Sequence, residues 1–302
     1  MIVRKPPHWA HMIFVWHGSV LREILPQLAL MLVVALMASH VETHVLGERA
    51  TSSFTLVGVT LALFLAFRNN VSYARYWEAR QLWGEMVISS RTLLSRTLCY
   101  FPSSEDEATR DCVLRHLVAL AYALKRQLRG EDETAALPML TAAENAALAP
   151  RGFKPVAILH MLRRLAAPVT EPGMRGLGLS WVLDEVIVRL ESVIGGCERI
   201  AATPIPFPYA VLMRRTVFIY CILLPFGLAE VMGAFTPVVS VFVAYTLLAL
   251  EQISNEIADP FGTSENDLPL ESFCRNIERN LLDLMGRPIP PPPAAEPGHV
   301  LR

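Results

Sequence analysis

The sequence predicts an all-α membrane protein, with four transmembrane helices in two hairpins plus a helical cytoplasmic region. Three observations lead to this fold class. Hydrophobic residues make up 53% of the 302 residues, charged residues only 18%, and the mean hydropathy is +0.37. The apolar residues gather in blocks that approach the roughly 20 residues a spanning helix needs. Two pairs of blocks are joined by very short links, which favours tight helical hairpins.

The four expected spans are Ile24–Leu46, Ser52–Phe67, Thr216–Met232 and Pro237–Ile253. The link in the first pair is GERATS and the link in the second is GAFT. Pro225 predicts a kink in the third span, because proline removes a helical hydrogen bond. The expected divisions are an N-terminal arm (1–23), hairpin one (24–67), a helical cytoplasmic region (68–215), hairpin two (216–255), a C-terminal segment (256–286) and a Pro-rich disordered tail (287–302).

Charge predicts the orientation of these spans. Of the 27 Lys and Arg residues, only Arg49 falls in a loop on the opposite side of the membrane from the rest. The positive-inside rule then places both termini and the long middle region in the cytoplasm of a multi-pass protein of the cell inner (plasma) membrane. The net charge of −1 provides no basic field for nucleic acid. The five scattered cysteines show no zinc-type spacing, so we expect buried reduced thiols and no cofactor.

The middle region carries helical rather than strand periodicity. Apolar residues recur at helical spacing from Val113 to Leu128, and Gly130 is a stop signal. A second helix is expected over Ser180–Ala202 for the same reason.

One segment, GVTLALFLAFRNNVSYARYWEARQLWGE, is apolar in its first half and charged in its second. From Val59 to Trp83 no Gly or Pro interrupts it. A helix of this length would run roughly 37 Å, which is longer than a span requires. We therefore expect one unbroken helix that leaves the membrane and continues into the cytoplasm.

Helical spacing sorts the faces of this helix. Val59, Leu63 and Phe67 lie at i, i+4 and i+8, and the stripe continues through polar or small residues below them. Those residues are Asn70, Ala74 and Gln81, whereas Arg68, Ser72 and Tyr76 fall nearly opposite. Two interpretations are open at this point, a packing face between helices or a pore wall with an apolar constriction.

Four motifs follow one another along the chain, namely VWHGSVLREILPQLAL, FRNNVSYARYWEARQLWGEM, ATPIPFPYAVLMRR and ISNEIADPFGTSENDLPLESFCRNIERNL. In sequence and in order they resemble the bestrophin family, and its bacterial branch in particular. The similarity runs from about Trp16 to Leu282. The resemblance implies a homopentameric ion channel, in which each subunit contributes four spanning helices and one pore follows the fivefold axis.

The resemblance also implies roles for particular residues. The family's narrow pore neck is lined by three apolar residues, which match Val59, Leu63 and Phe67 here. Its second constriction, the cytoplasmic aperture, matches Ile205 in TPIPFPY. The three prolines of that motif favour an extended bend, which would turn Ile205 toward the pore.

Calcium-activated members carry an acidic cluster after PFG, and this chain departs from it. The stretch is DPFGTSENDLPLE, with Ser264 at the first clasp position and Asp267 at the last. Because calcium prefers several oxygen ligands, usually with more than one carboxylate among them, Asp259 and Asp267 are weak calcium-clasp candidates, and no metal site is expected.

The acidic residues beside the stripe bear on which monovalent ion passes. Glu78 and Glu85 lie at its edge, where five subunits would turn each into an acidic ring. This arrangement favours cations of the sodium type. The alternative is a chloride or other anion channel of the same architecture, in which both acids pair with Arg75, Arg80 or Arg91.

Two other classes of protein compete with a channel. An intramembrane enzyme could use His8, His11 and His17 as a metal site, or the in-span acids Glu230 and Glu251, but no catalytic motif is present. A membrane scaffold could recruit partners through the prolines of the tail, Pro290 to Pro293. We expect no enzyme, and partners limited to ions, the lipid bilayer and further copies of the chain.

Overall fold

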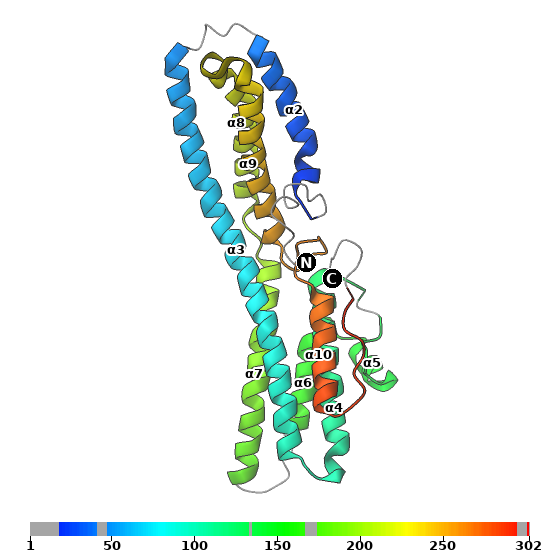
Figure 1. The fold of residues 1–302 in the computed structure, drawn as a ribbon. Coiled ribbons are helices and arrows are strands. Elements are labelled where there is room, and N and C mark those ends of the chain that lie inside the picture. The colour runs from blue at the N-terminus through cyan, green and yellow to red at the C-terminus, as the bar shows by residue number, and fades with distance from the viewer. Residues whose placement is uncertain (1–17, 41–46, 133–134, 167–173, 295–300, 302) are drawn as a thin grey trace. The chain divides into compact units, whose positions relative to one another are not determined.

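The computed structural model describes residues 18–40, 47–132, 135–166, 174–294 and 301. Helices are the regular elements of these described residues, and no strand occurs among them (Figure 1). The α-helices are α2 (Leu21–His40), α3 (Gly47–Tyr100), α4 (Glu107–Arg129), α5 (Ala142–Leu148), α6 (Lys154–Ala166), α7 (Met174–Ala202), α8 (Phe207–Met232), α9 (Thr236–Ala258) and α10 (Leu270–Leu284). Short 3-10 turns cover Ser104–Asp106 and Gly233–Phe235. The all-helical prediction is confirmed.

The chain divides into two compact units. We call residues 4–76 with 204–260 the apolar unit, and residues 77–203 with 261–302 the helical unit. Helix α3 contributes to both, since it is a single α-helix of 54 residues (Figure 1). The expectation of one unbroken helix across Val59–Trp83 is therefore confirmed.

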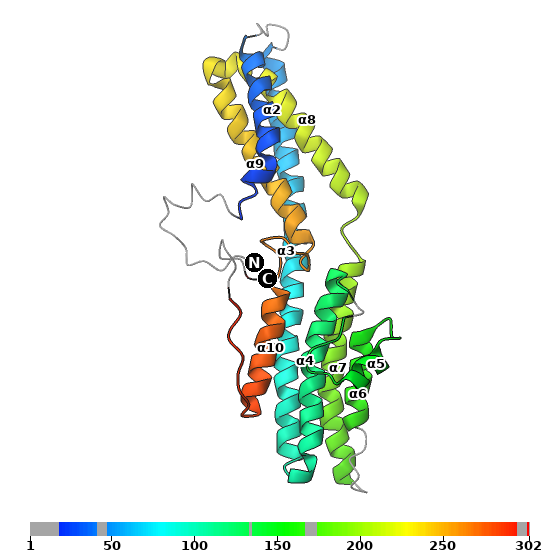
Figure 2. The same ribbon diagram turned by 90° about the vertical axis from the view of Figure 1, so that its right-hand side faces the viewer.

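In the apolar unit α2, α8 and α9 pack against one another (Figure 2). Their core is apolar and includes Ile24, Met31, Val217 and Ala244. Helix α3 adds Leu61 to this core. The 3-10 turn that joins α8 to α9 makes them a tight hairpin, as the GAFT link predicts.

The outer surface of the apolar unit is also apolar. Leu25, Leu32 and Leu36 of α2 are exposed, as are Ile219 of α8 and Phe242 of α9. Three stretches are long and apolar enough to cross a membrane, namely Leu21–His40, Phe54–Tyr100 and Phe207–Ala258, and the last contains both α8 and α9. A protein in water rarely leaves so much contiguous apolar surface uncovered.

Two glycines allow α3 and α8 to approach closely. The ring of Tyr220 on α8 lies where a Cβ of Gly58 would be, and Phe54 on α3 lies where a Cβ of Gly227 would be. A larger residue at either position would force the two helices apart.

The helical unit is organised around α4, which contacts α6, α7 and α10. The face of α4 that includes Leu114, Leu117 and Leu124 is fully buried. The helix ends where Gly130 adopts φ +60°, a conformation that glycine accepts without steric cost. The helix and its end are as predicted from the periodic apolar residues.

Three helix starts differ from the predictions. Helix α3 begins at Gly47, so GERATS is helical and not a loop, because Glu, Arg and Ala are good helix formers. Helix α8 begins at Phe207, nine residues before the expected span, because Pro206 and Pro208 stop the preceding chain and suit the first turn of a helix. The expected helix at Ser180 begins earlier as well, at Met174.

Candidate functional site: an apolar row on α3

Three large apolar side chains form an exposed row on α3. Val59, Leu63 and Phe67 are 64%, 55% and 56% exposed, respectively. Leu61 and Leu65, on the other side of the same turns, are each 2% exposed and pack into the core of the apolar unit. The helical spacing that groups Val59, Leu63 and Phe67 on one face is confirmed.

The polar continuation of the row is also solvent-accessible. Asn70, Ala74 and Gln81 are exposed, whereas Arg68 and Ser72 are buried on the opposite face, as the spacing predicts. The surface of α3 thus changes from apolar to neutral polar along one continuous face.

The two acids beside this face are not equivalent. Glu78 forms an ion pair with Arg199 of α7, and both side chains remain substantially exposed. Glu85 accepts a hydrogen bond from the hydroxyl of Ser89, 2.8 Å away and one turn further along α3. The charge of Glu78 is therefore offset by an arginine, although the arginine is not one of the three that the sequence suggested.

A buried ion pair lies behind the apolar row. Arg68 Nη1 lies 3.2 Å from Glu251 Oε1 of α9, and the two side chains are 2% and 5% exposed. Arg68 also donates to the side-chain oxygen of Asn255, whose amide donates to Glu251 Oε1 at 2.6 Å. Both terminal nitrogens of Arg68 and the carboxylate of Glu251 are hydrogen-bonded, which allows the pair to lie in an apolar environment. Among the described residues, Arg68 Nε has no hydrogen-bond partner.

Further polar contacts join α3 to α9 along the same line. Ser254 donates to Asn69 Oδ1 at 3.3 Å, and Arg75 Nε donates to the carbonyl oxygen of Ala258 at 3.2 Å. Together with Arg68 these contacts fix the rotation of α3 about its own axis. That rotation determines which side chains of α3 point outward.

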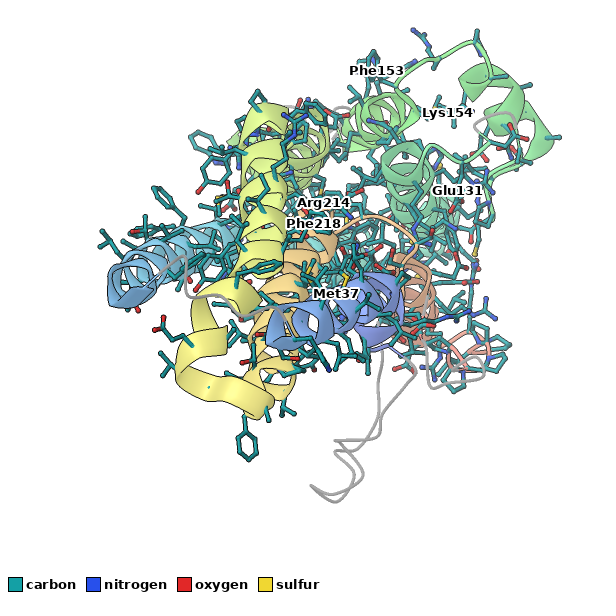
Figure 3. The ribbon with its side chains drawn as sticks, turned by 90° about the horizontal axis from the view of Figure 1, so that it is seen from above. Met37, Glu131, Phe153, Lys154, Arg214 and Phe218 are labelled. Carbon is teal, nitrogen blue, oxygen red and sulfur yellow. The ribbon has the colours of Figure 1, made fainter. Side chains whose placement is uncertain are left out.

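A pocket of about 250 Å³ opens between α2, α8 and α9, close to this ion pair. Glu251 lines the pocket together with apolar residues and with Arg214 and Phe218. Arg214 and Phe218 lie one turn apart on α8 (Figure 3). Glu251, which the sequence marked as a candidate polar site, thus serves as the partner of Arg68. Glu230, marked with it, lies in the last turn of α8.

Ile205 occupies the non-helical connection between α7 and α8. Its neighbours Pro204, Pro206 and Phe207 are exposed, while Ile205 itself is half-buried. Pro206 has φ −52° and ψ 123°, so the chain is extended immediately before α8. The bend predicted from the three prolines is present.

The two calcium-clasp candidates, Asp259 and Asp267, have different surroundings. Asp259 is an exposed residue at the C-terminal end of α9. Asp267 is buried, and its carboxylate accepts a hydrogen bond from the backbone N–H of Ser264 at 2.6 Å. Neither joins a group of three potential metal ligands within the described residues.

The histidines considered for a metal site of an intramembrane enzyme, His8, His11 and His17, lie outside the part of the chain that the structure describes.

Sequence reasoning missed the partners that lie far along the chain. Arg68 and Glu251 are 183 residues apart, and Glu78 and Arg199 are 121 residues apart. The sequence contained an indication of the first pair only. Arg68 and Glu251 are single charged residues in apolar helices, and such residues need a counter-charge.

The chain is similar in sequence to a described protein family and to several bacterial membrane proteins. Residues 1–283 match the family described as "Bacterial/Fungal Bestrophin protein". The "Voltage-dependent anion channel-forming protein RSc3414" of Ralstonia nicotianae is 40% identical over 293 residues, which cover 95% of each chain. The "Voltage-dependent anion channel-forming protein YneE" of Escherichia coli K12 is 38% identical over 94% of each chain.

Solved structures agree with this assignment. A bacterial bestrophin homologue from Klebsiella pneumoniae superimposes with a TM-score of 0.78 at 36% identity, covering 88% of this chain and 99% of that one. The apolar helices and these relatives identify a channel-type membrane protein, not an enzyme. The chain belongs to the bestrophin family, as its motifs predicted.

Proposed function

We propose that the chain is a passive channel for monovalent ions, with Val59, Leu63 and Phe67 as an apolar neck. The exposed row of these three side chains is the observation that carries the proposal. A ring of such residues holds no charge to attract an ion, and a narrow apolar constriction can gate by excluding water. Ile205 is the second constriction in this proposal, and Asn70, Gln81, Glu78 and Glu85 line or flank the pore below the neck.

The assembly in this proposal is a homopentamer with one axial pore. One chain contributes one copy of the row on α3, so a closed neck requires several copies arranged around an axis. Each subunit would span the inner membrane four times, with α2, the first half of α3, α8 and α9. The termini and the helical unit would then lie in the cytoplasm, where the positive-inside rule places the flanking arginines.

We propose anions as the conducted ions. The names of the relatives from Ralstonia and Escherichia coli describe anion channels. The cation selectivity expected from Glu78 and Glu85 is not supported by these relatives. The pairing of Glu78 with Arg199 removes its physical basis in part, because a ring of five ion pairs carries little net charge.

Current through the purified protein in a planar bilayer under a sodium chloride gradient tests both parts of the proposal. A steady current that reverses near the equilibrium potential of chloride supports an anion channel. Reversal near the equilibrium potential of sodium would overturn the proposed selectivity and favour a cation channel.

The neck is tested by replacing Val59, Leu63 and Phe67 together with Ala. Smaller side chains widen and wet the constriction, so we expect a larger current per channel. A matched control replaces Leu25, Leu32 and Leu36 of α2, which are similarly exposed and apolar. Equal currents in the native protein and both variants would contradict the assignment of the neck.

A further inference from the structure

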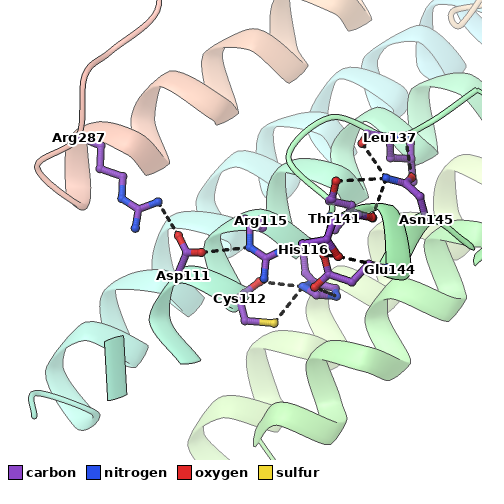
Figure 4. A network of polar contacts seen from close by, with 10 residues as sticks. Asp111, Cys112, Arg115, His116, Leu137, Thr141, Glu144, Asn145 and Arg287 are labelled. Carbon is purple, nitrogen blue, oxygen red and sulfur yellow. Dashed lines mark hydrogen bonds and ion pairs between the residues drawn. The ribbon is translucent and has the colours of Figure 1, made fainter. Parts of the chain in front are cut away.

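A cluster of three metal-ligand side chains lies on two helices of the helical unit that contribute no residue to the proposed pore. Cys112 and His116 are one turn apart on α4, and Glu144 comes from α5 (Figure 4). One ligand atom from each residue lies within 4.8 Å of the others. This is the one such group of three among the residues that the structure describes.

The histidine is already oriented as a ligand. His116 is buried, and its Nδ1 lies 2.8 Å from the carbonyl oxygen of Cys112. Because a carbonyl oxygen can only accept, Nδ1 carries the proton and Nε2 keeps a free lone pair. Cys112 Sγ lies 3.4 Å from this Nδ1, so the cysteine side chain must turn for the sulfur to share an ion with Nε2. Nε2 lies 4.0 Å from Glu144 Oε1. Metal-binding histidines in proteins are commonly held by this kind of hydrogen bond from the other ring nitrogen.

The glutamate is held by only one of its two oxygens. Glu144 Oε2 accepts hydrogen bonds from the backbone N–H and the hydroxyl of Thr141, at 2.7 Å and 2.8 Å. It also accepts a bond from Arg115 at 2.5 Å. These contacts leave Oε1 directed toward His116.

The positive charge of Arg115 is shared with other groups. Arg115 Nε lies 3.1 Å from Asp111 Oδ2, and Asp111 Oδ1 in turn lies 2.5 Å from Arg287 (Figure 4). Arg115 therefore contacts two carboxylates, those of Asp111 and Glu144, and it binds Glu144 through Oε2.

We propose that Cys112, His116 and Glu144 bind one zinc ion, or a transition-metal ion of the same class. The set of one sulfur, one nitrogen and one oxygen matches the ligands of zinc and not those of calcium or magnesium, which take oxygen almost exclusively. Donor atoms around tetrahedral zinc are about 3.3–3.7 Å apart, so closure requires movements of about 1 Å. Water fills the fourth position.

Binding converts the thiol of Cys112 to a thiolate, and its proton passes to solvent. The two ligand charges then balance the charge of the ion. Because two ligands belong to α4 and one to α5, the ion ties the short helix α5 to the body of the helical unit. This role is independent of ion conduction through the proposed pore.

The test uses the purified full chain in detergent, first stripped of metal with a chelator. Zinc is then titrated in competition with a chromophoric chelator of known affinity. We expect one zinc ion per chain, and affinity at least about 100-fold weaker in Cys112→Ser and in Glu144→Gln, because even supporting residues account for 10–100-fold. Cys99→Ser, which removes an exposed thiol elsewhere, is the matched control and leaves the affinity unchanged.

The two variants are chosen to preserve the fold. Serine has nearly the shape of cysteine, and glutamine retains the capping contact with Thr141 at the start of α5. Circular dichroism and gel filtration verify that each variant is folded. His116 is left in place because it is buried.

A second readout identifies the sulfur ligand directly. Cobalt substituted at the site gives a thiolate-to-cobalt charge-transfer band that disappears in Cys112→Ser. Zinc bound equally well by both variants would be held elsewhere, for example by His8 and His11, and would overturn the proposal. Failure of the native chain to retain zinc, or a cobalt complex without the band, would overturn it as well.

Discussion

Glu78 illustrates how one contact changes the functional meaning of a residue. Its carboxylate lies beside the exposed face of α3 and pairs with Arg199 of α7. Exposed ion pairs contribute only about 0–1 kcal/mol to folding, so this pair has little influence on stability. Around an axis, however, the loss of either partner would leave a ring of like charges, and the sign of those charges would determine the potential that a passing ion meets.

Glu78→Gln and Arg199→Gln are predicted to shift selectivity in opposite directions. The first leaves the arginine unopposed and increases anion permeability, and the second leaves the acid unopposed and increases cation permeability, each by at least about twofold. Reversal potentials in a sodium chloride gradient measure both effects. Glu191→Gln, which removes an ion pair with Arg163 elsewhere in the helical unit, is the control and produces no shift. Shifts of the same sign would contradict the pairing.

The buried thiols give a prediction that concerns the packing of the helical unit. Burial raises the pKa of Cys197 to about 12, and burial also raises the pKa of Cys274, so neither is a thiolate at pH 8. A maleimide reagent at pH 8 should label the exposed Cys99 within minutes and reach Cys197 and Cys274 only after denaturant is added. Mass spectrometry of the digested protein locates the label. Rapid labelling of Cys197 without denaturant would show that α7 is not packed as described.

The sequence predicts single residues well where the signal is periodic. Helical spacing places Leu63 on one face of α3 with Val59 and Phe67, and it places Leu117 on the apolar face of α4 that is buried. It does not predict that the α3 face is exposed. It does not predict the partner of Glu78 either, because Arg75 and Arg80 are closer along the chain than Arg199. The zinc-ligand cluster was missed for the same reason: Cys112 and His116 are a visible i, i+4 pair, but Glu144 becomes a third ligand only when α5 folds back onto α4.

At the scale of elements, the pair Arg68–Glu251 joins α3 to α9. The two groups are buried, and Asn255 bonds to both of them. Removing one partner of a buried ion pair costs about 3–5 kcal/mol, because the other charge is left without compensation. Replacing both partners with apolar residues costs much less.

Glu251→Leu should therefore destabilise the protein more than the double variant Arg68→Met with Glu251→Leu. Arg68→Met alone should have an intermediate effect, because an unpaired carboxyl can take up a proton whereas a guanidinium cannot lose one. Thermal unfolding in detergent, followed by size-exclusion chromatography, ranks the three variants. A double variant as unstable as Glu251→Leu would contradict this reasoning. It would indicate that the intact ion pair itself stabilises the protein, and that the loss of stability is not due to an uncompensated buried charge.

The start of each helix was harder to predict than its existence. The prolines that break the chain at Ile205 also begin α8, so the helix starts well before the apolar block that marked the third span. The tail behaves similarly. Its prolines predict an extended chain, yet Pro290 accepts a hydrogen bond from Arg279 of α10 at 3.0 Å. Composition identifies such a segment but contains no information about the side chain on which it rests.

At the scale of the whole molecule, the proposed function depends on several copies sharing one pore. A single chain exposes one row on α3, and the same row could instead face lipid or a neighbouring helix. The two possibilities differ in how the current depends on the number of altered subunits. If all copies line one neck, a single blocked copy stops conduction for the whole assembly.

Leu63→Cys in a Cys99→Ser background tests this dependence. A soluble, bulky thiol reagent is added until half of the introduced thiols are modified, as measured by mass spectrometry. For one neck shared by five subunits, about 3% of the current should remain, since all five copies must be unmodified. About half should remain if each chain conducts by itself. Phe153→Cys, at an exposed site before α6 (Figure 3), is the control in which modification leaves the current intact. A current insensitive to modification at Leu63 would remove α3 from the pore.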